Sequence, residues 1–400
     1  MTSASKPSLA ATSAEIIPVS LMGHVAALVN NGATLRLEDV LVQAGRHFAD
    51  TLNPSVIPGS DTRRQKATAL AWYVLAMLDP SVQGGQLVVS APGDPDIQRL
   101  GMEVLGVGMG IELLRSQGQI DARTLRKTHG TFDFEACGRG GQSRIAIELK
   151  GSLNGASIGK HQTSFRGKLR TAGFLSPGGL ARGYNAAIGL IFSAWSMTGG
   201  TRGNDFQLLD PSGDAENSRD DAIRSAIRFY ARRYDEVAGL PRAAAMLDAL
   251  AAVDAPIEEI PDLAPWLGRD AGHRAERRFN RASLTFEFEE GESTYWGGFW
   301  DAQYVRPPFK VDGLSANAFP VAYTGIDRRV MRRLRARQFD EFLAFSAKPQ
   351  GYRFSFVDRR DGDDRAAPTV SGYVFIDADG VCAAWFDRYP DYGSKIRREE

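Results

Sequence analysis

The sequence predicts an α+β fold in which a mixed sheet is flanked by helices, with a helical region before it and a mostly-β domain after it. Three observations predict this class. Apolar residues recur at helical spacing between residues 14 and 79. Residues 131–151 alternate between apolar and polar side chains on either side of a glycine-rich turn. Beyond residue 267, short aromatic and β-branched runs are typical of a β-meander.

Composition indicates a soluble globular protein, with 43% hydrophobic and 24% charged residues. The 48 basic and 48 acidic residues cancel, so a nucleic-acid surface would have to be a local patch. Cys137 and Cys382 lack the spacing of a disulfide framework or a zinc site, which favours a reducing compartment. Without a leader or a long apolar span, we expect a cytoplasmic location and no membrane partner.

Composition shifts divide the chain into five expected parts. They are a disordered tail (1–13), a helical N-terminal region (14–90), an α/β core (91–215), a helical bridge (216–266) and a C-terminal α+β domain (267–400).

The core is expected to open with a helix. Asp94-Pro95 forms a cap and first turn, and apolar residues recur at helical spacing up to Gly118. Gly106, Gly108 and Gly110 each weaken this helix by about 1 kcal/mol relative to Ala. We expect another backbone to pack closely against them.

A hairpin over residues 131–151 is the centre of the prediction. In its first arm Phe132, Phe134 and Ala136 alternate with Asp133 and Glu135, and in its second Ile145, Ile147 and Leu149 alternate with Ala146, Glu148 and Lys150. If the turn centres near Gly140, Asp133 falls opposite Glu148, with Lys150 one step along the same face.

Two carboxylates across a strand pair repel each other unless a cation compensates for them. Mg²⁺ takes one or two carboxylates together with phosphate and water oxygens, which suits Asp133 and Glu148. Lys150 can then hold a water or a phosphate oxygen. The alternative is an ordinary solvated hairpin whose charges lie at the surface.

Asp133 followed by Glu148-Leu149-Lys150 resembles the motif of the PD-(D/E)xK nuclease superfamily, which has the restriction-endonuclease-like fold. The resemblance implies that Asp133 and Glu148 bind Mg²⁺, with Mn²⁺ as a substitute, and that the Leu149 carbonyl joins them. It implies that Lys150 orients or activates the attacking water. Phe132 stands where the family usually has proline.

The same resemblance extends over about residues 95–212, because the expected order of helix, three meandering strands, helix and buried strand is that of the family core. It makes Glu103 on the first helix a further site candidate, with Glu112 as its competitor and a solvent-facing glutamate as the alternative for either. Gln162, near the start of the second helix, is another candidate.

Basic residues on two predicted helices are the candidates for nucleic-acid binding. A charged helix is more often simply a solvated face. In the C-terminal domain the long helix predicted over 327–345 is Arg-rich, and the aromatic residues of the preceding strand could stack bases, although strand aromatics are more often core. The candidate residues are Lys160, Arg166, Lys168, Arg332 and Arg333, with Tyr295, Trp296, Phe299 and Trp300 as the aromatic residues.

The resemblance leads us to expect a metal-dependent nuclease that hydrolyses DNA in preference to RNA, in a restriction or defence setting. A homodimer would be the simple way to cut both strands of a duplex. The alternatives are a catalytically inactive nucleic-acid-binding protein of the same fold and a protein-interaction scaffold.

Overall fold

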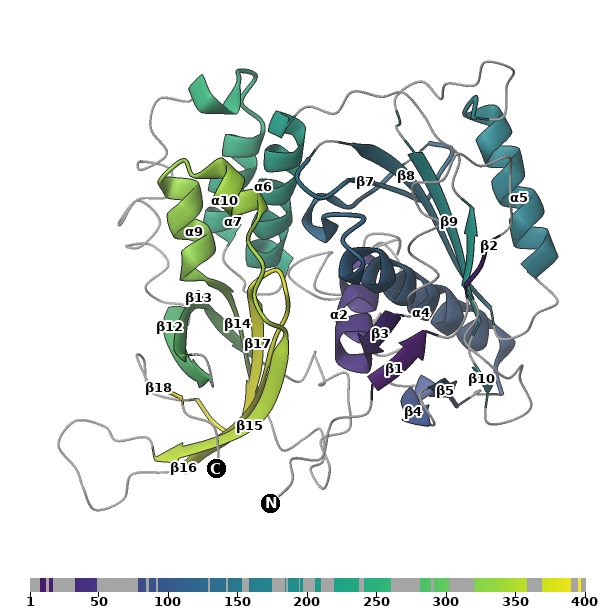
Figure 1. Ribbon diagram of the computed structural model, residues 1–400. Coiled ribbons are helices and arrows are strands. Elements are labelled where there is room, and N and C mark those ends of the chain that lie inside the picture. The colour runs from purple at the N-terminus through teal and green to yellow at the C-terminus, as the bar shows by residue number, and fades with distance from the viewer. Residues whose placement is uncertain are drawn as a thin grey trace. The chain divides into compact units, whose positions relative to one another are not determined.

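The computed structural model describes part of the chain, and the described residues form two compact units, Met1–Ala222 and Ile223–Glu400 (Figure 1). The described residues are 8–11, 14–16, 33–48, 78–83, 86–90, 93–128, 130–141, 143–152, 158–174, 184, 186–193, 195–196, 206–209, 219–236, 241–259, 281–288, 291–301, 320–357, 369–389 and 395–396.

The first unit is built on a six-stranded mixed sheet in the order β2-β11-β9-β8-β7-β6. Strands β6, β7 and β8 form an antiparallel meander, and β9 is parallel to β8. A parallel neighbour requires a crossover, which α5 (Ile158–Thr171) provides. The strands are β2 (Ala14–Ile16), β6 (Arg126–Lys127), β7 (Phe134–Cys137), β8 (Arg144–Ser152), β9 (Ala186–Ser193) and β11 (Phe206–Leu209).

Helix α4 (Pro95–Ser116) begins where the sequence predicts. The Asp94 carboxylate accepts hydrogen bonds from the backbone N–H groups of Asp96 and Ile97, and Pro95 takes the first helical position. A Cβ on Gly106 would lie 2.5 Å from the backbone nitrogen of Gly151 in β8. The expectation of a closely packed backbone is therefore confirmed at Gly106 and at Gly108, whereas Gly110 faces the Leu149 side chain.

Helices α4 and α5 cover opposite faces of this sheet (Figure 1). Ile147 and Leu149 of β8 belong to the α4 core, whereas Ala146 packs with Phe165 and Leu169 of α5. Because side chains alternate along a strand, Glu148 and Lys150 share the α5 face.

Smaller elements complete the first unit. They are β1 (Ser8–Ala11), paired antiparallel with β3 (Ala33–Arg36); α2 (Leu37–Phe48), packed on α4; a three-stranded sheet of β10 (Trp195–Ser196), β5 (Gln86–Val89) and β4 (Ser81–Gln83); and η3 (Ala122–Thr124).

The second unit contains a seven-stranded sheet in the order β15-β16-β17-β14-β13-β12-β18, antiparallel except between β12 and β18. Its strands are β12 (Arg281–Phe288), β13 (Gly291–Asp301), β14 (Val321–Asp327), β15 (Gln350–Val357), β16 (Thr369–Ile376), β17 (Val381–Phe386) and β18 (Lys395–Ile396). Its helical elements are α6 (Arg219–Glu236), which crosses the division between the units, α7 (Pro241–Ala251), η5 (Ile257–Glu259), α9 (Arg328–Arg335) and α10 (Phe339–Leu343).

Helix α6, part of the expected bridge, packs on this second sheet. The Tyr230 hydroxyl donates to the Asp379 carbonyl at 2.8 Å, and the ring of Tyr234 meets that of Trp296 edge to face. The bridge residues on α6 therefore share a core with the C-terminal domain.

The fold differs from the sequence prediction in the N-terminal region. Residues 8–11, expected in the loose tail, form β1, and the region 14–90 contains strands as well as helix α2. The Ser- and Ala-rich composition of residues 8–11 does not predict a strand, but antiparallel pairing with β3 stabilises one. Two parts of the expected helical region 14–90 fall on residues outside the description: residues 20–30 lie wholly outside the described residues, and of residues 65–79 only 78 and 79 are described.

In the second unit the prediction of a single long helix over 327–345 is wrong. The chain breaks into α9 and α10 at Arg337, whose φ of 59° is in the left-handed region. Strand β14 was not predicted, although all of its residues are buried. No helix in the described part of the chain is long and apolar enough to cross a membrane.

Candidate functional site

Asp133 immediately precedes β7 and is held there by its neighbours. The Thr128 backbone N–H donates to the Asp133 carbonyl at 3.0 Å, and the Thr128 hydroxyl donates to the Phe132 carbonyl. Phe134 pairs with Ile147, so Asp133 stands opposite Glu148, in the register that the turn predicts. The Asp133 backbone N–H also donates to Glu148 Oε2 at 3.1 Å.

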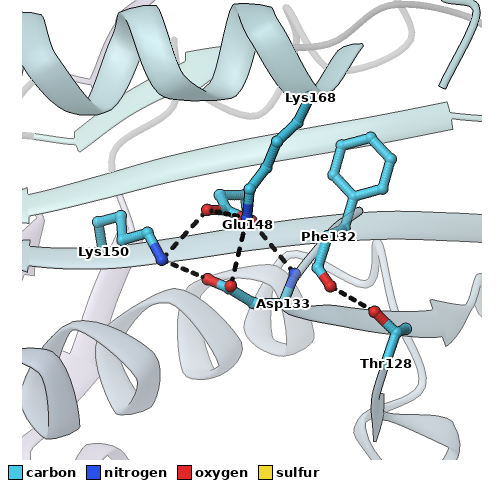
Figure 2. A network of polar contacts seen from close by, with 6 residues as sticks. All are labelled: Thr128, Phe132, Asp133, Glu148, Lys150 and Lys168. Atoms are coloured by element: carbon cyan, nitrogen blue, oxygen red, sulfur yellow. Dashed lines mark hydrogen bonds and ion pairs between the residues drawn. The ribbon is translucent and has the colours of Figure 1, made fainter. Parts of the chain in front are cut away.

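Two carboxylates and two ammonium groups converge at this point (Figure 2). Lys150 Nζ lies 2.7 Å from Asp133 Oδ2 and 3.1 Å from Glu148 Oε1. Lys168 Nζ lies 2.7 Å and 2.6 Å from the two Glu148 oxygens and 3.4 Å from Asp133 Oδ1. We call these four residues the carboxylate–lysine centre.

Burial differs within the centre. The Glu148 side chain is 4% exposed, whereas those of Asp133, Lys150 and Lys168 are between 26% and 29% exposed. A buried carboxylate needs a cation and hydrogen bonds to offset its lost hydration. Glu148 has both, and the open side of the centre can admit solvent or a ligand.

Electrostatics keep the Lys150 ammonium charged. Burial lowers the pKa of Lys150, but the Glu148 and Asp133 carboxylates together outweigh it, and the net pKa is raised. The pKa of the nearby His161 on α5 is shifted in the opposite direction, downward. Burial lowers the pKa of His161, and the charges of Lys150 and Lys160 lower it further.

Lys168, a candidate for nucleic-acid binding, contacts the two carboxylates. On α5 it lies beside Leu169 and three residues after Phe165, both of which are buried against the sheet. Because helix positions three apart lie on the same face, Lys168 shares the sheet-facing side of α5 with Phe165. This spacing is the signal in the sequence that places Lys168 near the strands.

A second polar cluster on the same face was not predicted. Glu135, expected on a polar surface, is 4% exposed and forms an ion pair with Arg126 and another with Arg144 at 2.8 Å. The Tyr184 hydroxyl donates to the same carboxylate at 3.1 Å, and the Arg144 guanidinium lies over the Tyr184 ring. The strand register brings these groups together, since Arg126 pairs with Glu135 and Arg144 with Cys137.

The other predicted site residues lie further out. Glu103 is exposed on α4, the helix that covers the opposite sheet face, and no described residue bonds to it. Its competitor Glu112 is buried and bound by Arg115 at 2.8 Å and 2.5 Å. Gln162 is half-buried on α5, and Lys160 and Arg166 are exposed there.

Leu149 lies in the middle of β8, with its side chain in the α4 core against Gly110. The ladder with β7 ends at Ile147, so among the described residues β8 pairs only with β9 from Glu148 onward. This side of the strand borders the carboxylate–lysine centre.

The candidates in the second unit divide into exposed and packed residues. Arg332 is exposed, whereas Arg333 is half-buried, donates to the Glu341 carbonyl at 2.9 Å and lies over the Phe345 ring. Tyr295 and Phe299 are buried in the sheet, which confirms the core alternative for them. Trp296 is half-buried against Tyr234, and the Trp300 side chain lies outside the described residues.

Among the described residues, no three His, Cys, Asp or Glu side chains are grouped as a metal site would group them. The donor set that the centre does offer is a pair of carboxylates with four oxygens, all of which are hard ligands. Both carboxylates already meet at one cation, the Lys168 ammonium. The donor chemistry therefore fits a hard cation.

The chain was compared with models of known protein families, with curated proteins and with solved structures, and none of the three comparisons found a match.

Proposed function

We propose that this protein is a metal-dependent nuclease that hydrolyses phosphodiester bonds, in DNA in preference to RNA. The observation that carries the proposal is the convergence of Asp133, Glu148 and Lys150 within hydrogen-bond distance on one sheet face. The order α4, β6, β7, β8, α5, β9 supports it, because the resemblance to the restriction-endonuclease-like fold implies this order.

Mg²⁺, or Mn²⁺ in its place, would be held by the carboxylates of Asp133 and Glu148, with the Leu149 carbonyl as the further ligand that the resemblance implies. When bound, such an ion polarises the phosphoryl group and lowers the pKa of a bound water. The convergence of both carboxylates on the Lys168 ammonium is the feature of this chain that fits a cation at this position.

Lys150 has the role of orienting a water or a phosphate oxygen. Its ammonium is charged, anchored to Asp133 at 2.7 Å and partly exposed, so a proton on Nζ can point toward a ligand. That charge also offsets the negative charge that develops on phosphorus oxygens as the bond to the leaving group breaks. No covalent bond to the protein is required.

Substrate binding would come from local basic patches, since the chain as a whole carries no net charge. Lys160 and Arg166 on α5 are exposed on the helix that also carries Lys168. If both strands of a duplex are cut, a homodimer supplies the second centre. A restriction or defence setting is proposed with it, on the family resemblance alone.

A catalytically inactive nucleic-acid-binding protein of the same fold is the second candidate. The observation that favours it is Lys168, because two ammonium groups already neutralise both carboxylates. This candidate binds DNA in a salt-dependent way and does not cut it.

The test is incubation of the purified wild type and Lys150→Ala with plasmid and single-stranded DNA, with Mg²⁺, with Mn²⁺ and with chelator. We expect cutting that requires the metal and falls by at least about 100-fold in Lys150→Ala. Arg170→Ala, which removes an exposed charge on α5, is the matched control. Salt-sensitive binding without cutting would favour the inactive alternative, and the absence of both would favour a scaffold.

A further inference from the structure

Two lysines together contact every carboxylate oxygen of the centre. Asp133 Oδ2 is bound by Lys150, and Asp133 Oδ1 by Lys168. Glu148 Oε1 is bound by both lysines, and Glu148 Oε2 by Lys168 and by the Asp133 backbone N–H. A divalent cation shared by the two carboxylates would therefore bind oxygens that already accept hydrogen bonds from an ammonium group.

The two lysines differ in how they contact the carboxylates that a divalent cation would bind. Lys150 contacts one oxygen of each carboxylate, and its contact with Glu148 is the longer one at 3.1 Å. Lys168 contacts both oxygens of Glu148 and the second oxygen of Asp133. Lys168 therefore contacts three of the four carboxylate oxygens, the one on Asp133 at 3.4 Å, and so competes for more of them than Lys150 does (Figure 2).

Electrostatic repulsion makes joint occupancy unfavourable. A doubly charged ion bonded directly to these oxygens would lie within a few ångströms of the Lys168 ammonium in its present position. Lys168 is carried by α5 and is 26% exposed, so its long side chain can turn toward solvent without disturbing the strands.

We propose that Lys168 sets the affinity of the centre for a divalent cation, because its ammonium and the cation compete for the carboxylates of Asp133 and Glu148. The inference rests on the proposed function, in which these carboxylates hold the ion. In the metal-free protein Lys168 stabilises the buried Glu148 carboxylate, and binding of the ion releases Lys168 from it.

The experiment measures Mn²⁺ binding to the full chain by electron paramagnetic resonance, without any substrate. Lys168→Met keeps the apolar stem and removes the charge, and we expect it to bind Mn²⁺ roughly tenfold more tightly than the wild type. Lys168→Arg keeps the charge and should bind no more tightly. Arg170→Met is the matched control, because it removes an exposed charge from the same helix, and it should leave the affinity unchanged.

Thermal unfolding gives a second readout that also checks folding. Without metal, Lys168→Met should melt below the wild type, because among the described residues Glu148 then keeps Lys150 as its single cationic partner. Saturating Mn²⁺ should raise the melting temperature of Lys168→Met more than that of the wild type. An unchanged difference between the two proteins would contradict the competition.

Glu148→Gln separates failure of this inference from failure of the proposed function. If the wild type binds Mn²⁺, Glu148→Gln does not, and Lys168→Met binds no more tightly, the competition is overturned and the metal site stands. If neither the wild type nor Lys168→Met binds Mn²⁺, both proposals are overturned.

Discussion

Two buried glutamates on one sheet face have similar partners but different surroundings. Glu148 and Glu135 are 3% and 4% exposed, and each is bound by two cationic side chains. Only Glu148 stands opposite a second carboxylate, that of Asp133. The described partners of Glu135 are instead Arg126, Arg144 and the Tyr184 hydroxyl, and none of these three is a second anion that could share a metal ion.

This contrast predicts different consequences for the same substitution. Glu148→Gln should abolish Mn²⁺ binding and metal-dependent cutting, because one of the two ligand carboxylates is lost. Glu135→Gln should retain both, and should lower the free energy of unfolding by about 1–3 kcal/mol through its weakened hydrogen bonds to charged groups. Calorimetry and denaturant unfolding measure the two effects. Loss of Mn²⁺ binding in Glu135→Gln would contradict the assignment of the site to Glu148.

Residues that strand register controls could be predicted from the sequence. Period-two alternation and the position of the turn are enough to place Asp133 opposite Glu148, with Lys150 on the same face. Lys168 could not be predicted in the same way. Its contact with Glu148 spans 20 positions of chain and depends on how α5 crosses over the sheet, which the hairpin pattern does not specify.

At the scale of elements, α4 approaches the backbone of β8 so closely at Gly106 that this position has no room for a side chain. A Cβ on Gly106 would lie 2.5 Å from the Gly151 nitrogen and 2.7 Å from the Lys150 carbonyl carbon, both in the backbone. A Cβ on Gly167 of α5 would have no neighbour within 4 Å. A side chain at Gly106 would therefore collide with the sheet, whereas a side chain at Gly167 would meet open space.

Gly106→Ala should lower the free energy of unfolding by roughly 1–3 kcal/mol, because the backbone of β8 must move to accommodate the methyl group. Gly167→Ala should raise it by up to about 1 kcal/mol, because alanine favours the helix and meets no obstacle. Gly106→Ala should also weaken Mn²⁺ binding, since it displaces β8 at Lys150, two residues from Glu148. Equal stability changes in the two variants would show that α4 and β8 are further apart than described.

The elements that sequence patterns predicted well are those with one strong local signal. The cap at Asp94 and the glycine turn near Gly140 are local, and α4 and the β7–β8 hairpin follow from them. The break at Arg337 and strand β14 lack such a signal. A continuous Arg-rich helix pattern hides the left-handed Arg337, and β14 is buried throughout, so it shows no alternation.

At the scale of the molecule, the α+β class was predictable because periodicity changes from helix to strand along the chain. The candidate centre belongs to the first unit alone, since all four of its residues precede Ala222.

The second unit contains three buried groups that lose a proton on ionisation, namely Tyr295, Tyr323 and Cys382. Burial is the main cause that raises the pKa of each of them.

These three groups predict how the second unit responds to alkaline pH. In the unfolded chain the thiol and the phenols ionise near their ordinary pKa values of about 9 and 10, while the folded chain keeps their protons. Their contribution to stability is therefore complete below about pH 9 and decreases as the pH rises further, because the unfolded state then binds fewer protons. Denaturant unfolding followed at increasing pH measures this decrease.

Tyr323→Phe provides the decisive comparison, because it removes one of the three protons and little volume. It should cost about 1 kcal/mol at neutral pH, where the hydrogen bond from the Tyr323 hydroxyl to the Tyr295 carbonyl is lost. Above about pH 10 its stability should fall less steeply than that of the wild type, by the slope that one proton contributes. Tyr389→Phe, which removes the hydroxyl of a ring that is 49% exposed, is the control for the substitution itself. Equal slopes for the wild type and Tyr323→Phe would mean that the Tyr323 phenol is ionised while the sheet is still folded.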